Sequence, residues 1–298
     1  MSVTVDISVV MGSYNQCETL KTVLTGYLTQ EGTATFEVIV VDSTSTDGTS
    51  EMMKSFDANF KFTPIIQENN GKAAARNRGV SEASGDLIII TDSDMIPDPA
   101  FIQTHVDAQR QLTEPGCFEG VTYNMIEEKW PCTEDNLMPY IQEKLKPNQK
   151  LGFHYFLTGN ISFPKALFES FGGFDESFKS YGWEDLELGY RMSLKKVPLR
   201  YLPAAKNYHY HVITKEEEIE RCIAKGESAK RFLAKHPNLK WFLGLNPVTV
   251  FLFKTLDWDG AVVRFFRRRF ACSSDSISHK VGFLFLKEHY YFRGLIGR

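Results

Sequence analysis

Two carboxylates stand one residue apart in Asp92-Ser93-Asp94, directly after the apolar run at Leu87–Ile90. A short apolar run rich in β-branched residues is typical of a strand buried on both faces of a parallel sheet. Ligands of open α/β sheets bind beyond the carboxyl ends of such strands. A carboxylate pair there suits a hard divalent cation that also contacts substrate phosphates. Taken alone, the same residues also fit an acidic turn.

Small polar groups follow two earlier strand-like segments. The tripeptide Gly12-Ser13-Tyr14 ends the first segment, and Asp42 ends the second. Because the carboxyl ends of parallel strands share one edge of a sheet, these groups are expected to meet where a nucleotide could bind. Asp42 could accept a hydrogen bond from a base or a ribose. The alternative, compatible with the first, is that Thr46 or Asp47 caps the next helix.

A third loop leads into an alanine-rich helix predicted for residues 72–83. Lys72 lies in its first turn and Arg76 one turn later. A cation at the start of a helix opposes the helix dipole. An anionic ligand at the same place would remove that penalty.

The elements that position these groups alternate along the first part of the chain. Strand patterns at 6–11, 36–41 and 87–90 are separated by helix patterns at 18–28, 49–56 and 72–83. This order predicts an α/β fold with a mostly parallel sheet. After Thr113 it changes: residues 117–123 and 157–163 are strand-like, and between them lies the polar, proline-interrupted stretch 127–150. That stretch is a candidate acceptor loop or lid.

Composition excludes several classes of protein. The chain has 298 residues, 43% of them hydrophobic and 24% charged, as in an ordinary globular protein. A net charge of −3 gives no sign of nucleic-acid binding. Five scattered cysteines without CxxC spacing predict reduced thiols rather than a disulfide framework or a zinc site. Met1 leads straight into a strand-like segment, so we expect a cytoplasmic protein.

With these motifs in order, the chain resembles the family 2 glycosyltransferases of the GT-A fold. The matching motifs are SYN at 13–15, VDSTSTDGT at 41–49, NGKAAARNRG at 70–79 and the DxD motif at 92–94. Residues 172–192, GGFDESFKSYGWEDLELGYRM, are similar to the acceptor segment of chondroitin-polymerase-like, galactosyltransferase-like and polypeptide GalNAc-transferase-like enzymes. The resemblance runs from about Ile7 to His211.

The resemblance implies a nucleotide-sugar pocket and a Mn²⁺ or Mg²⁺ site. The pocket residues would be Gly12, Ser13, Tyr14, Asp42, Ser93 and a basic residue at Lys72 or Arg76. Asp94 would bind the metal, and Asp92 would hold the ribose or a metal-bound water. The late metal-binding histidine matches His209, and His211, which has the same side-chain phase on an extended strand, is the competing choice.

Glu184 and Asp185 open a predicted helix that runs to Lys195 and Lys196. Acids at its start and bases at its end match the helix dipole, which suffices as an explanation for Glu187. Direct displacement at an anomeric carbon also needs a base for the acceptor hydroxyl. The resemblance assigns that role to Asp185 and acceptor binding to Glu184. Trp183 would offer an apolar face to the sugar ring.

The last sixty residues combine aromatic runs with arginines. Four residues interrupt the apolar stretch, so it falls short of a membrane-spanning helix: Asn246, Pro247, Thr249 and Lys254. Two interpretations remain: a helix lying on an anionic membrane surface, or one packed on the rest of the protein. We therefore divide the chain into a nucleotide-sugar-binding half at 1–115, an acceptor-binding half at 116–235 and a helical tail at 236–298.

The sequence thus predicts a metal-dependent inverting glycosyltransferase that uses a nucleotide-diphosphate sugar, most readily a UDP-sugar. The acceptor would be a hydroxyl of a glycan or of a lipid-linked glycan, and the tail would place the enzyme peripherally on the inner face of the membrane. The alternatives are a retaining enzyme like the polypeptide GalNAc-transferases, a sugar nucleotidyltransferase, and a non-catalytic nucleotide-sugar-binding module.

Overall fold

The computed structural model describes two compact units. Their bounds are 1–177 with 184–212, here called the sheet unit, and 178–183 with 213–298, the helical unit. The residues described are 5–139, 145–179, 181–245, 247, 250, 251, 253, 258–272 and 276–297.

The described strands of the sheet unit form one nine-stranded sheet in the order β3-β2-β1-β4-β8-β6-β9-β5, with β7 paired to β6. The strands are β1 (Ile7–Ser13), β2 (Phe36–Asp42), β3 (Lys61–Ile66), β4 (Leu87–Ile90), β5 (Met95–Pro97), β6 (Cys117–Met125), β7 (Leu137–Pro139), β8 (Ile161–Pro164) and β9 (Leu199–His209). The first four run parallel, whereas β8 is antiparallel to β4 and β6. The predicted mixed, mostly parallel sheet is confirmed.

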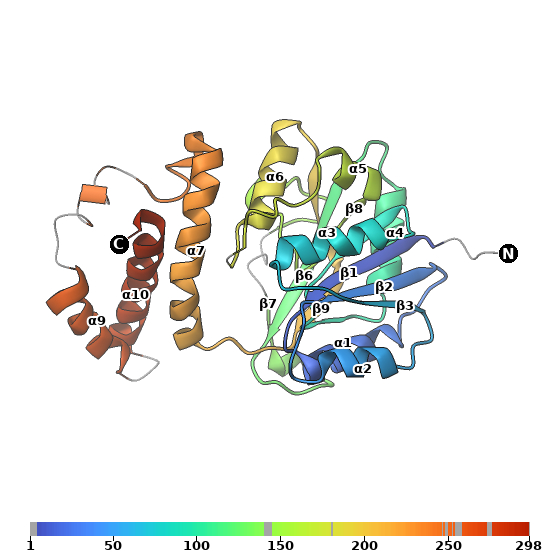
Figure 1. Ribbon diagram of the computed structural model, residues 1–298, viewed down its shortest axis with the longest axis horizontal. Coiled ribbons are helices and arrows are strands. Elements are labelled where there is room, and N and C mark those ends of the chain that lie inside the picture. Colours follow the sequence, from blue (N-terminus) through green and yellow to red (C-terminus); the bar gives the residue numbers. More distant parts are fainter. Residues whose placement is uncertain are drawn as a thin grey trace. The chain divides into compact units, whose positions relative to one another are not determined.

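Helices cover both faces of this sheet (Figure 1). One face is covered by α1 (Cys17–Tyr27), α2 (Thr49–Ser55) and α4 (Phe101–Arg110), which pack against Val9, Val38 and Ile89. The other carries α3 (Lys72–Glu82), α5 (Lys165–Ser170) and α6 (Glu184–Leu194). The central strands are buried on both sides, as their uninterrupted apolar sequences require.

The sequence prediction lacks β3, β5, α4, α5 and most of the long strand β9. Pro64 weakens the strand pattern of β3, but it is tolerated at the sheet edge that β3 occupies. Residues 127–150, predicted to be irregular, contain β7 and the short 3₁₀ turn Glu134–Asn136. A second such turn spans Phe153–Tyr155, and the strand predicted over 157–163 begins later, at Ile161.

The helical unit is built on α7 (Lys215–Lys235), α9 (Val263–Phe270) and α10 (Ile277–Ile296), with a 3₁₀ turn at Pro237–Leu239 and a π-helical turn at Trp258–Val262. Thr214 and Glu217 form a reciprocal capping box that fixes where α7 begins. Two glycines allow α7 and α10 to touch backbone to backbone. A Cβ on Gly226 would lie 2.1 Å from the Tyr291 carbonyl oxygen, and one on Gly294 would lie 2.1 Å from that of Ile223.

Because of this contact, α7 belongs to the same unit as the residues that follow it. The sequence-based division instead places a boundary after α7, between residues 235 and 236. The structure divides the chain at Val212, before α7 begins. Much of the described part of the predicted tail is helical. Of its four interrupting residues, only Pro247 lies among the described residues. No described helix combines the length and the apolarity needed to cross a membrane.

Candidate active site

A buried arginine joins the two acidic motifs of the sequence. Arg76 lies on α3 with 1% of its surface exposed. Its Nη2 donates to Asp92 Oδ1 at 2.8 Å, and its Nη1 donates to Glu184 Oε1 at 2.8 Å. The guanidinium therefore fixes the start of α6 against the loop after β4. A planar group with several donors can make both contacts at once.

Lys72 adds a second cation beside Asp92, with its Nζ 3.5 Å from Asp92 Oδ1. Burial disfavours the charge of Asp92, yet Lys72 and Arg76 outweigh it and lower the pKa of this carboxyl to about 2. Asp92 is therefore ionised at any physiological pH. Because Lys72 is the first residue of α3, its charge also lies at a helix N-terminus, as predicted.

The environment of Asp185 disfavours its ionised form, unlike that of Asp92. Burial, followed by the neighbouring charge of Glu184, disfavours its ionised form more than Arg76 favours it, and its pKa is raised to about 7. Its side chain remains partly exposed, whereas Glu184 is 4% exposed. One Glu184 oxygen, Oε2, is buried without a hydrogen-bond partner among the described residues. A carboxyl with a pKa near 7 and access to solvent is suited to take up a proton at neutral pH.

The second acid of the DxD motif faces a histidine. His209 Nε2 lies 3.3 Å from Asp94 Oδ2, and Asp94 Oδ1 is buried without a hydrogen-bond partner among the described residues. Asn124 Oδ1 lies 3.0 Å from His209 Nδ1. Because an amide oxygen only accepts, His209 Nδ1 is the donor to Asn124, and Nε2 is the ring nitrogen that faces Asp94.

These donors fit a divalent cation. A carboxylate with a free oxygen, an imidazole lone pair and a hydrogen bond that orients the imidazole are features of protein metal sites. No group of three or more His, Cys, Asp or Glu side chains with metal-site geometry occurs in the described part of the chain. Asp94 and His209 are thus the two described side chains here that could contact a cation.

His211, the competing choice, has a different neighbour. Its Nδ1 lies 3.1 Å from Glu128 Oε1, and the rings of His209 and His211 are 6.4 Å apart. The strand β9 ends at His209, so the predicted extended continuation to His211 is not formed. The contacts bring His209, rather than His211, to Asp94.

The predicted nucleotide residues lie at the carboxyl ends of their strands. Gly12 pairs with Val41 in the sheet, and a Cβ on it would lie 3.3 Å from Ala75 Cβ, close to α3. Ser13 is buried and its Oγ has no described partner, whereas Tyr14 is 52% exposed. Ser93 is buried and its hydroxyl contacts Gln16.

Asp42 is fully buried, and its carboxylate already accepts hydrogen bonds from its own loop and from α2. It accepts from Ser45 N at 3.1 Å, from Ser50 Oγ at 2.7 Å and from the Ser45 hydroxyl. The capping alternative is not confirmed, because the N-cap of α2 is Gly48 without a side-chain cap, although Asp47 Oδ1 accepts from Thr49 N at 3.1 Å beside it. Asp42 thus shapes the loop after β2 in this structure.

Residues 8–171, more than half of the chain, match the protein family described as "Glycosyl transferase family 2". The chain belongs to this family of sugar-transferring enzymes. Residues 142–215 of this family 2 member also match "N-terminal domain of galactosyltransferase", and this second match contains α6 and His209. The predicted enzyme class and family are confirmed.

The family 2 chain is similar to several curated enzymes with different names. Validoxylamine A glucosyltransferase of Streptomyces hygroscopicus subsp. jinggangensis is 30% identical over 65% of this chain and 52% of its own length. Chondroitin synthase of Escherichia coli is 26% identical over 74% of this chain and 37% of its own. Hyaluronan synthase of Pasteurella multocida is 26% identical over 73% and 26%. The chain thus spans about half the length of these relatives or less.

Two solved structures share its fold. A mannosyltransferase from Pyrobaculum calidifontis, in complex with GDP-mannose and Mn²⁺, superposes with a TM-score of 0.62 at 16% identity and covers 100% of this chain and 89% of its own. TarS of S. aureus (residues 1–349), in complex with UDP, superposes with a TM-score of 0.57 at 16% identity and covers 98% and 92%. The predicted GT-A fold is confirmed.

Two residues near the candidate site were missed from the sequence. Asn124 pairs with His209 across β6 and β9, a register that no local pattern shows. Glu119, 3% exposed, accepts from Leu157 N at 3.2 Å, and its pKa is raised well above the usual range by burial. A charged residue inside the apolar run of β6 was the available signal for Glu119.

Trp183, expected to offer a face to a sugar ring, packs within the helical unit. Its Nε1 donates to the Lys225 carbonyl oxygen at 2.9 Å, and its ring lies 5.3 Å from that of Phe232. A sugar-stacking role has no support from these contacts.

Proposed function

We propose that this family 2 member is a metal-dependent inverting glycosyltransferase. It moves a sugar from a nucleotide-diphosphate sugar, a UDP-sugar in our proposal, to a hydroxyl group of a glycan or lipid-linked glycan. The observation that carries the proposal is the Arg76 bridge, because it holds the start of α6, and so Asp185, against the loop of Asp92 and Asp94.

Asp185 is the proposed base. As the acceptor oxygen forms its bond to the anomeric carbon, the bond from that carbon to the diphosphate oxygen breaks and its electron pair stays on the diphosphate. The proton of the acceptor hydroxyl passes to the Asp185 carboxylate. With a pKa raised to about 7, Asp185 is ionised in a large share of molecules at neutral pH and basic enough to accept that proton.

Glu184 is proposed to bind the acceptor. Its Oε1 is taken by Arg76, but Oε2 is buried without a described hydrogen-bond partner. A buried acceptor atom of this kind is costly when unpaired, so a hydroxyl donor next to it is favoured. A second hydroxyl of the acceptor glycan, next to the reacting one, would donate that bond and so hold the reacting hydroxyl beside Asp185.

Asp94 and His209 are proposed to hold Mn²⁺ or Mg²⁺, with Asn124 keeping the imidazole in the required tautomer. When bound, the cation would offset negative charge on the departing diphosphate. The complexes of TarS with UDP and of the Pyrobaculum enzyme with GDP-mannose and Mn²⁺ support a nucleotide donor and a divalent metal by shared fold.

The test is turnover with a panel of nucleotide sugars. Purified protein with Mn²⁺ should slowly release nucleotide from one donor in the absence of acceptor. With acceptor present, Asp185→Asn should lower transfer by about 10²- to 10⁴-fold while donor binding survives, because only the base is removed. Asp86→Asn, an exposed residue at the opposite end of β4, is the matched control and should transfer normally. Near-normal turnover of Asp185→Asn would contradict the assigned base.

A further inference from the structure

The helix α10 is apolar on two faces. Its inner face buries Gly282, Leu286 and Phe292. On its outer face Ile277 is 80% exposed, Val281 41% and Leu284 60%. These three residues follow the spacing i, i+4, i+7 and therefore form one stripe on the helix, here called the outer stripe. A solvated helix face would carry polar residues at those positions.

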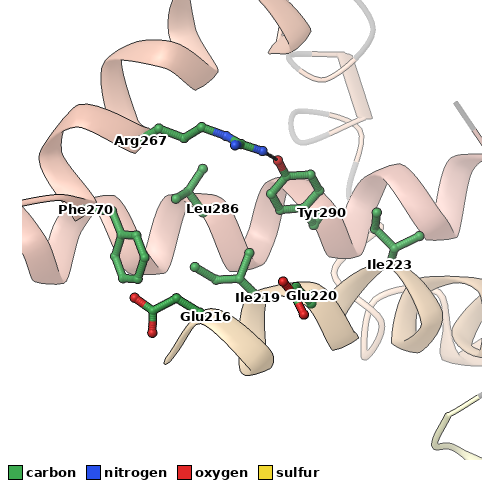
Figure 2. A pocket seen from close by; sticks show the side chains of 8 residues that line it. All are labelled: Glu216, Ile219, Glu220, Ile223, Arg267, Phe270, Leu286 and Tyr290. Carbon is green, nitrogen blue, oxygen red and sulfur yellow. Dashed lines mark hydrogen bonds between the residues drawn. The ribbon is translucent and has the colours of Figure 1, made fainter. Parts of the chain in front are cut away.

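The inner face of α10 already has its partners. Leu286 and Tyr290 line a hollow of about 390 Å³ together with Ile219 and Ile223 of α7 (Figure 2). Arg267 crosses above it to the Tyr290 hydroxyl, and Glu216 and Glu220 are also part of its lining. On this side α10 packs against α7 and α9 of its own unit. The outer stripe is not part of that contact.

Most charged residues of α9 and α10 are positive, although the exposed Glu288 lies one turn beyond Leu284 in line with the outer stripe. From Arg264 to Arg298 the sequence holds eight basic residues against Asp275 and Glu288. Arg264, Arg268 and Lys280 are exposed and have no partner among the described residues. By contrast, Arg269 contacts Phe265 and Ser278, and Lys287 pairs with Glu218. Three cations thus stand uncompensated on α9 and α10.

We propose that α9 and α10 form a binding surface for an anionic phospholipid bilayer. The outer stripe and Phe265, which is 49% exposed, enter the interface between headgroups and acyl chains, and Arg264, Arg268 and Lys280 contact the lipid phosphates. An apolar stripe on a pair of helices that carries three exposed cations is complementary to such a surface in both polarity and charge. A neutral protein partner would leave the three cations uncompensated.

Co-sedimentation of the full chain with vesicles tests this surface without any donor or acceptor. Binding is expected to vesicles containing phosphatidylserine or phosphatidylglycerol, but not to pure phosphatidylcholine, and it should weaken as salt is raised. Reversing Arg264, Arg268 and Lys280 to Glu should lower partitioning by at least about tenfold, since each cation near the surface contributes to attraction. Lys21, Lys54 and Lys195, exposed in the sheet unit, provide a control with the same change of charge when all three become Glu.

A second pair of variants tests the apolar part. Leu284→Ser should lower binding to anionic vesicles, whereas Leu194→Ser, at a position of the sheet unit that is also 60% exposed, should not. Because both side chains are exposed, both variants should keep the melting temperature of the parent protein. The proposal is overturned if anionic and neutral vesicles bind equally or not at all. It is equally overturned if Leu284→Ser leaves vesicle binding intact and instead dissociates a dimer in sedimentation velocity.

Discussion

Arg76 and Glu184 are 108 residues apart in the sequence and joined by a 2.8 Å hydrogen bond in the buried centre of the site. The same guanidinium reaches Asp92. One side chain thus holds the nucleotide-side loop and the acceptor-side helix in a fixed relation, and the geometry of the proposed reaction depends on it.

Replacing Arg76 should destabilise the fold as well as stop transfer. Arg76→Met removes the partner of two carboxylates, and breaking a buried ion pair costs about 3–5 kcal/mol because a charge is left uncompensated. Urea unfolding followed by circular dichroism would measure the change. Arg78→Met is the control, because that exposed side chain makes only a surface pair with Glu82 and its loss should cost at most about 0.5 kcal/mol. Equal effects of the two substitutions would show that the bridge does not stabilise the fold.

Metal binding should distinguish the two histidines. In titrations of Mn²⁺ followed by electron paramagnetic resonance in the presence of UDP, Asp94→Ala and His209→Ala should abolish binding, because each removes one of two proposed protein ligands. Asn124→Leu should weaken it by about 10- to 100-fold through loss of the bond that orients His209.

The matched control for His209 is His211→Ala, which should bind Mn²⁺ normally because its described ion-pair partner is Glu128. Chelation by EDTA should abolish transfer by the unaltered chain. Loss of Mn²⁺ binding in His211→Ala but not in His209→Ala would reverse the assignment, and full activity in metal-free buffer would remove the metal from the mechanism.

The rate should depend on pH through Asp185. Its pKa is raised to about 7 from an ordinary carboxyl value, so the base is protonated and inactive at low pH, and kcat/KM should rise with pH and level off above about 7. Glu184→Gln removes the neighbouring negative charge that helps to raise this pKa. Its profile should therefore shift to lower pH. An unchanged inflection in that variant, or a shift to higher pH, is the result that the assignment does not allow.

The sequence predicts the nucleotide half of the fold well, since Ile7–Ser13, Phe36–Asp42 and Leu87–Ile90 are apolar runs ended by polar loops. Local patterns of this kind carry their own signal. The strands β3 and β9 were missed because Pro64 and the polar residues of β9 obscure strand patterning, and their pairing partners lie far away in the sequence.

Within the site, the motifs identify residues but not contacts. Arg76 was predicted as one of two alternatives for a nucleotide contact, and its bridge between Asp92 and Glu184 exists only after α3 and α6 pack on the same face of the sheet. The placement of His209 at Asp94 likewise follows from the antiparallel pairing of Met95 with His209 in β5 and β9. Such contacts are set by tertiary structure and leave no trace in spacing.

The most direct test of the proposed mechanism is the anomeric configuration of the product. Transfer from a donor of defined configuration, followed by ¹H NMR of the product before any mutarotation or hydrolysis, reports it directly. A single displacement with Asp185 as base predicts a glycosidic bond of configuration opposite to that of the donor. A product with the donor's own configuration would contradict this account and favour the retaining alternative.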